Sequence, residues 1–168
     1  MAHKFEDMSG LIEHFRLRSH RKARAHYLAS KSSFKKHIWV GVPIIVITTV
    51  VGSGVILNLI EGYAPTGPLV IGGLSLVAAV LSTFQTFFGY SENAAKHKNA
   101  GNQYSSLYRR LAIITTQLAT SGFDQSKISG ELEQIRAAWD AIELEAPDVA
   151  DELYDLAKTE QADDGDGV

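Results

Sequence analysis

The chain has 168 residues, with 16 Lys and Arg against 19 Asp and Glu, a formal net charge of -3 and no cysteine. The missing cysteine excludes disulfides, Cys-ligated zinc or iron–sulfur sites, thiol nucleophiles and lipidation through cysteine. The charge balance disfavours a strongly basic nucleic-acid binder, and we expect no nucleic-acid partner.

The charges are distributed unevenly along the chain. Residues 1–36 carry nine Lys and Arg against three acids, whereas residues 37–91 contain Glu61 as their single charged residue. Residues 92–123 carry four basic residues against one acid, and residues 124–168 carry three basic residues against fourteen acids. The near-neutral total charge is therefore the sum of two basic segments, one nearly uncharged segment and one acidic segment. The nearly uncharged segment, residues 37–91, says most about the fold.

Residues 10–33 are predicted to form a basic helix, with Ser9 as its N-cap. Its Lys and Arg residues are expected to set membrane topology and to contact anionic lipid. The histidines His14, His20 and His26 are six positions apart, which does not match the i, i+4 spacing of a helical metal-binding pair. We expect no metal site here, while a pH response remains open.

Two apolar segments, residues 39–60 and 68–88, are long enough to cross a bilayer. A hydrocarbon core about 30 Å thick needs roughly 20 apolar residues in a helix. A core helix of a soluble protein is usually shorter and carries one polar stripe. Glycine and proline between the two segments favour a tight turn, so residues 37–90 are predicted to form an antiparallel transmembrane hairpin.

The orientation of this hairpin follows from its flanks. Basic residues precede the first span and follow the second, and the connecting loop has none. The positive-inside rule therefore predicts a multi-pass protein of the cell's inner (cytoplasmic) membrane with both termini in the cytoplasm. Basic and aromatic residues at the span ends are the predicted membrane-interface anchors: Lys35, Lys36, Trp39, Tyr63 and Tyr90.

Span two carries a row of small residues at spacing 3-4-3-4 and, about 200° around the helix, a row of large apolar residues. Small faces allow helices to approach closely, whereas large aliphatic and aromatic faces suit lipid. Two interpretations of the small and polar residues are open. One is packing within the hairpin, with hydroxyls bonding back to the i−4 carbonyl. The other is assembly of several hairpins around a water-filled path.

The candidate pore and helix-packing residues come from both spans: Thr48, Thr49, Gly52, Ser53, Gly72, Ser75, Ala79, Ser82, Gln85 and Thr86. Among them, Gln85 carries an amide that is costly in a bilayer unless it has a partner. We therefore expect Gln85 to bond to another helix or to border a wet lumen.

Residues 91–160 are predicted to form cytoplasmic helices, the first of which continues from span two. Two apolar stripes at helical spacing indicate bundle packing. Pro147 ends the second helix, and a short third helix is predicted over residues 148–160. Residues 161–168 are predicted to be a disordered acidic tail. The predicted fold is an all-α membrane protein, with an N-terminal basic helix, a two-helix transmembrane hairpin and a C-terminal cytoplasmic helical bundle.

No catalytic motif is recognisable in the sequence. HExxH, GxSxG and a glycine-rich loop between a strand and a helix are all missing. We therefore expect no catalytic residues, no cofactor and no enzymatic activity.

The order of basic helix, two close spans and long helix resembles the SLATT family, over about residues 10–120. The resemblance rests on segment 25–28, on Trp39 and Pro43, and most strongly on segment 91–97 followed by Ala100, Tyr104, Leu107, Arg109 and Arg110. It leaves residues 124–168 unexplained. It implies a two-transmembrane effector of bacterial conflict systems, which an upstream nucleotide-signal enzyme or sensor protein triggers to oligomerise and permeabilise the membrane.

Three functions are considered. The leading hypothesis is a homo-oligomeric pore or channel-like effector of antiphage defence, for which the resemblance leaves open a messenger, a partner protein or constitutive conduction. The alternative is a non-conducting membrane-anchored scaffold whose cytoplasmic helices recruit a partner protein. A small membrane enzyme has the least support.

Overall fold

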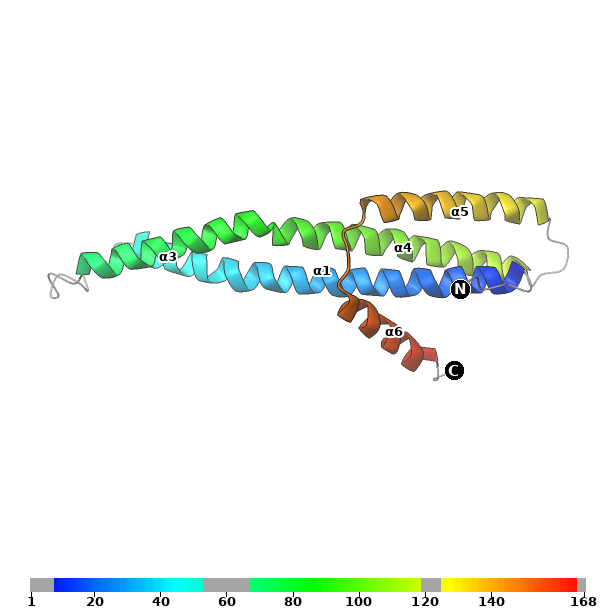
Figure 1. The fold of residues 1–168 in the computed structure, drawn as a ribbon, viewed down its shortest axis with the longest axis horizontal. Coiled ribbons are helices and arrows are strands. Elements are labelled where there is room, and N and C mark those ends of the chain that lie inside the picture. Colours follow the sequence, from blue (N-terminus) through cyan, green and yellow to red (C-terminus); the bar gives the residue numbers. More distant parts are fainter. Residues whose placement is uncertain (1–7, 53–66, 119–124, 166–168) are drawn as a thin grey trace. The chain divides into compact units, whose positions relative to one another are not determined.

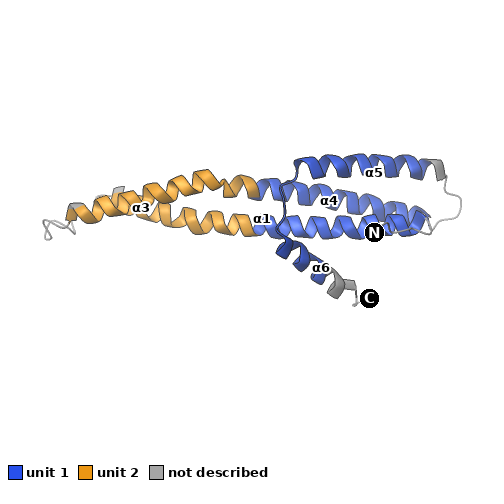
Figure 2. Ribbon diagram, viewed as in Figure 1, with its two compact units in different colours: residues 1–31, 94–168 blue, residues 32–93 orange. Residues whose placement is uncertain are grey.

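The computed structural model describes residues 8–52, 67–118 and 125–165. Across these residues the regular structure is entirely helical (Figure 1), and the helices are α1 (Met8–Gly52), α3 (Gly67–Phe88), α4 (Tyr90–Leu118), α5 (Gln125–Glu145) and α6 (Asp151–Gly165). The chain divides into two compact units (Figure 2). Unit 1 comprises residues 1–31 and 94–168, and unit 2 comprises residues 32–93.

A single helix, α1, contains both the predicted basic helix and the first part of the predicted span one. Its basic half belongs to unit 1 and its apolar half to unit 2. The basic half favours an aqueous environment and the apolar half a lipid environment. The backbone hydrogen bonds of the helix do not depend on this change of side chains, so one helix can contain both halves. The rest of span one and the connecting loop, with Ser53 and Tyr63, lie outside the described residues.

Span two and the helix after it are separated by a break at Gly89. Helix α3 ends at Phe88, and Gly89 has a φ of 51°, which glycine adopts without the steric cost of a Cβ atom. The Asn93 side-chain nitrogen donates to the Phe88 carbonyl at 3.2 Å, and the Asn93 backbone N–H donates to the Gly89 carbonyl at 2.9 Å. Helix α4 is therefore a separate element, where the sequence analysis expected a continuation.

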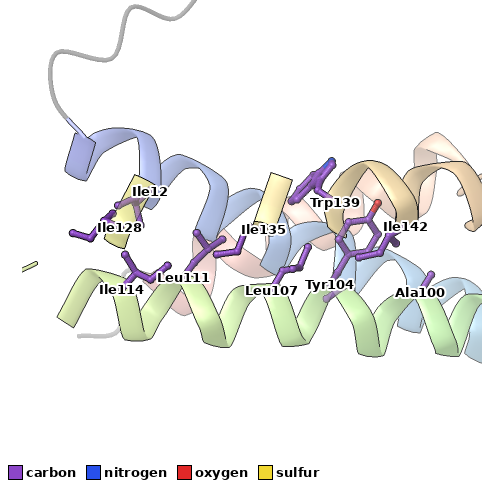
Figure 3. Close-up of a cluster of buried hydrophobic side chains, with 11 residues drawn as sticks. Ile12, Ala100, Tyr104, Leu107, Leu111, Ile114, Ile128, Ile135, Trp139 and Ile142 are labelled. Carbon is purple, nitrogen blue, oxygen red and sulfur yellow. The ribbon is translucent and has the colours of Figure 1, made fainter. Parts of the chain in front are cut away.

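The hydrophobic core of unit 1 joins α1, α4 and α5 (Figure 3). The two apolar stripes recognised in the sequence supply most of it: Tyr104, Leu107, Leu111 and Ile114 from α4, and Ile128, Ile135, Trp139 and Ile142 from α5. Ile12 of α1 is fully buried between them. Burying side chains of this size removes apolar surface from water at roughly 25 cal/mol per Å², which holds the three helices together.

Helix α6 follows a connector over residues 146–150 that contains Pro147. The helix runs over Asp151–Gly165 instead of residues 148–160, so it includes the first part of the predicted disordered tail. No proline interrupts this stretch, and alanine and glutamine before Asp163 favour helix. The remaining tail residues, 166–168, lie outside the described residues.

Candidate functional site

Helix α3 is buried along one face in unit 2. Its buried and half-buried positions, at spacing 4-3-4-3-4, are Gly67, Ile71, Leu74, Ala78, Leu81 and Gln85. Gln85 contacts α1, so this face is the seam between the two helices of unit 2. The large apolar row predicted from the sequence is therefore divided, because Leu74 and Leu81 lie on the seam while Val70, Val77, Phe84 and Phe88 are exposed.

The predicted row of small residues lies outside this seam. Each member is one position after a seam residue, which is about 100° around the helix. All five are exposed: Gly72, Ser75, Ala79, Ser82 and Thr86. A Cβ atom added at Gly72 would meet no atom within 4 Å. Within the described part of a single chain, this small-residue row is not part of the helix contact.

The threonines of both spans bond back to their own helices. Thr86 Oγ1 donates to the Ser82 carbonyl at 3.1 Å, and Thr48 Oγ1 donates to the Ile44 carbonyl at 2.8 Å. Thr48 and Thr49 are exposed, like the small-residue row of α3. Because these hydroxyl protons are satisfied internally, the exposed faces suit lipid, another helix or water.

Gln85 belongs to the seam and not to the exposed row. Its Nε2 atom lies 3.4 Å from His37 Nδ1, and a Cβ atom added at Gly41 would lie 3.0 Å from the same nitrogen. Of the two roles expected for Gln85, this geometry supports hydrogen bonding to another helix. Sequence reasoning missed both partners. The one available signal was Gly41, a small residue early in span one.

The described interface anchors are accessible. Lys35 and Lys36 are exposed, and Trp39 keeps 70% of its surface exposed, so its indole is available to a membrane interface. Tyr90 is half-buried and stacks on Phe88, with ring centroids 5.4 Å apart.

Three basic residues of α1, Arg18, Lys22 and Arg24, lie beside acidic side chains of α5 and α6 in unit 1. Lys22 Nζ is 2.5 Å from a Glu143 carboxylate oxygen of α5, and Arg24 Nε is 2.6 Å from a Glu160 carboxylate oxygen of α6. The pKa of Glu143 is lowered, first by the Lys22 hydrogen bond. From the sequence, these basic residues were predicted to contact anionic lipid and to set membrane topology. The opposite charges of the two chain ends were the signal for this pairing.

A buried histidine pair joins α1 to α4 in unit 1. His26 Nδ1 and His97 Nδ1 are 3.1 Å apart, and His26 stacks on Tyr104 with ring centroids 5.6 Å apart. Burial lowers the pKa of His26 to about 4, aided by the charges of His97 and Lys22, and burial also lowers the pKa of His97. The described residues contain no group of three His, Asp or Glu placed to hold a metal ion. The geometry fits a hydrogen bond between neutral rings.

The histidine pair predicts an acid-sensitive unit 1. Because the folded-state pKa of His26 is about 4 and the unfolded value is near 6.5, the unfolded state binds more protons between these values. The stability that neutral His26 contributes to unit 1 is therefore complete above about pH 6.5, and this contribution is lost as pH falls toward about 4. Thermal unfolding of the full-length protein in detergent, followed by circular dichroism over this range, measures the loss. His26→Phe should flatten the dependence, and an unchanged slope in this variant would contradict the assignment.

Two stretches of helix, within Met8–Val51 and Leu69–Leu118, are long and apolar enough to cross a membrane. Only 6% of the most apolar window of each is buried. The core helix of a soluble protein would be mostly buried. These apolar helices therefore need an apolar environment that the described part of the chain does not supply.

The family model for the SMODS and SLOG-associating 2TM effector domain family 4 matches residues 12–163. The chain belongs to this SLATT family. The match extends beyond the resemblance over residues 10–120, so α5 and most of α6 are part of the SLATT domain and not an unexplained extension. No curated protein and no solved structure matches the chain. The two-transmembrane description and the two exposed apolar helices together indicate a membrane location for this SLATT protein.

Proposed function

We propose that this SLATT protein is a homo-oligomeric, channel-like membrane effector of a bacterial antiphage or conflict system. The observation that carries the proposal is the exposed small-residue row of α3. In a bilayer, small residues gain most from close contact with another helix, and hydroxyl groups can line a wet lumen. Because two helices cannot enclose a pore, the row implies a contact between several copies of the chain.

The remaining parts of the proposal concern topology and partners. Both termini lie in the cytoplasm, and the exposed Lys35 and Lys36 contact anionic lipid at the inner face of the membrane. An upstream nucleotide-signal enzyme or a sensor protein supplies the trigger, and the effector itself performs no catalysis.

Leucine substitutions on two neighbouring faces of α3 test the channel proposal. Ser75→Leu combined with Ser82→Leu places bulky side chains on the small-residue row, and we expect dye leakage from induced cells to fall about tenfold because the helices can no longer approach. Thr83→Leu is the matched control, since Thr83 is exposed and adjacent to Ser82 but lies outside the row. Unchanged leakage in the double variant would overturn the channel proposal. So would intact membranes in cells that express the parent protein at high level, both with and without a trigger.

The alternative is a non-conducting scaffold that recruits a protein partner. The specific observation in its favour is Leu144 on α5, which is 89% exposed and so offers apolar surface to a partner. Reconstituted full-length protein that conducts no ions, but captures a partner that Leu144→Ser releases, would select the scaffold over the channel.

A further inference from the structure

In unit 1, buried apolar side chains anchor α5 to α1 and α4, and ion pairs join α5 and α6 to α1 at the solvent-exposed edge. We propose that residues 125–165, here called the clasp, are a restraint that is pinned at this edge by ion pairs and opens when the effector is activated. The part of this proposal that concerns activation rests on the proposed channel function. The part that concerns opening stands on the contacts within unit 1.

The α1–α4 contact has the features of a permanent interface. Small residues bring the two backbones together: Ala23 and Gly101 are buried, and a Cβ atom added at Gly101 would lie 3.3 Å from the Ala23 carbonyl oxygen. Ser30 Oγ donates to the Ala94 carbonyl at 2.8 Å, and the Tyr27 hydroxyl donates to Asn102 Oδ1 at 2.8 Å. Close packing and internal hydrogen bonds leave little to be gained by separating these helices.

The seam between the clasp and this helix pair is less complete. A cavity of about 490 Å³ lies among α1, α4 and α5, beside Phe15 and Leu132. A second cavity of about 400 Å³ lies under the 146–150 connector, beside His26 and Tyr104. Side chains that line these openings lack the dispersion contacts that filled space would provide. The buried side chains of α5, among them Ile135 and Trp139, therefore carry the apolar attachment of the clasp.

Ion pairs between α1 and the clasp add to this apolar contact. Lys22 and Arg24 of α1 pair with Glu143 of α5 and Glu160 of α6, and Arg18 lies 3.9 Å from the same Glu143 carboxylate. The side chains in these pairs keep between 25% and 52% of their surface exposed, so dissolved salt can reach and screen them. Beyond its apolar contacts, the clasp is thus held by interactions that ionic conditions or a charged partner can readily weaken.

The clasp and the first candidate span contact or include the same helix. Helix α1 carries the clasped residues Lys22 and Arg24 and, farther along the sequence, the apolar half in unit 2. A restraint on the basic half therefore acts on the helix whose sequence continues into the first candidate span. Opening the clasp frees α1 and leaves its basic residues without their carboxylate partners.

Amide hydrogen exchange on the full-length protein in detergent tests whether the clasp opens. In Glu143→Gln with Glu160→Gln, we expect α5 and α6 amides to exchange about fivefold faster while α4 is unchanged, and added salt should have the same effect on the parent protein. Glu145→Gln with Glu152→Gln, which changes neighbouring exposed acids of the same helices, is the control. The clasp would be overturned if α5 and α6 exchanged no faster than α4 in every one of these proteins and if added salt did not change their exchange rates.

A reversible lock tests whether opening activates the effector. Because the chain has no cysteine, Lys22→Cys with Glu143→Cys creates a unique thiol pair. A short bis-thiosulfonate crosslinker joins the two thiols through disulfides that a reductant cleaves, each thiol displacing a sulfinate. We expect the locked protein to leak dye from liposomes at least tenfold more slowly than the same protein after reduction. Equal leakage in both states overturns the regulatory role while the exchange result stands. No leakage in any state, with exchange as expected, refutes the channel instead of the clasp.

Discussion

Replacing Gly101 with leucine is expected to lower the free energy of unfolding of unit 1 by about 3 kcal/mol. A Cβ atom at this position would lie 3.0 and 3.1 Å from two Tyr27 ring carbons and 3.3 Å from the Ala23 carbonyl oxygen. The carbonyl belongs to the α1 backbone and cannot move without shifting the helix. The Tyr27 ring is restrained as well, since its hydroxyl bonds to Asn102 and lies 3.3 Å from Ser105 Oγ.

Gly130→Leu is the matched control for Gly101→Leu. Gly130 lies in α5, is exposed, and a Cβ atom there would meet nothing within 4 Å. Because glycine costs a helix about 0.5–1 kcal/mol relative to residues with better helix propensity, Gly130→Leu should leave stability unchanged or raise it slightly. Thermal unfolding of both full-length variants in detergent compares the two. Equal melting temperatures would show that α1 and α4 do not approach closely at Gly101.

The core of unit 1 is the part of the fold that the sequence predicts best. The stripe from Tyr104 to Leu118 and the stripe from Ile128 to Ile142 repeat at helical spacing over several turns, and their regular members are buried together. When apolar residues repeat at helical spacing over several turns, one irregular position does not change which face is predicted to be buried.

What the pattern cannot supply is the partner of a given face. Periodicity placed the small and large rows of α3 on opposite sides but did not say which direction faces α1, and the observed seam lies about 100° from the small row. Pairs such as Gly41 with Gln85, or His26 with His97, join residues from different helices and depend on how those helices pack. No local signal encodes that register.

The charge distribution of the sequence was a weaker signal, which was overlooked, that the basic and acidic segments contact each other. The basic start and the acidic end of the chain were each interpreted against the solvent or the membrane, although opposite charges at two ends of one chain also favour contact with each other. The ion pairs of Lys22 and Arg24 realise that contact. Gly89 was interpreted as part of the small face of span two and not as the residue at which α3 ends.

Trp139→Ala should lower the free energy of unfolding of unit 1 by about 3–5 kcal/mol, the usual range for deleting a large buried aromatic side chain. The indole is 4% exposed and makes edge contacts with Phe15 at 5.9 Å and Tyr104 at 5.1 Å between ring centroids. Arg18 and Lys22 lie over the ring, at 5.0 and 5.8 Å from its centroid. Truncation therefore removes the aromatic anchor of α5 and the surface on which two cations rest.

Leu144→Ala is the control for this substitution, because it removes an apolar side chain from the same helix where 89% of the surface is exposed, and its effect should stay within about 0.5 kcal/mol. Chemical denaturation of the full-length proteins in detergent measures both changes. Trp139→Ala should also speed amide exchange in α5 more than in α4, since α1 and α4 keep their own contact through Gly101. A uniform acceleration in both helices would mean that Trp139 supports the whole of unit 1, and that α5 is not a separately held part.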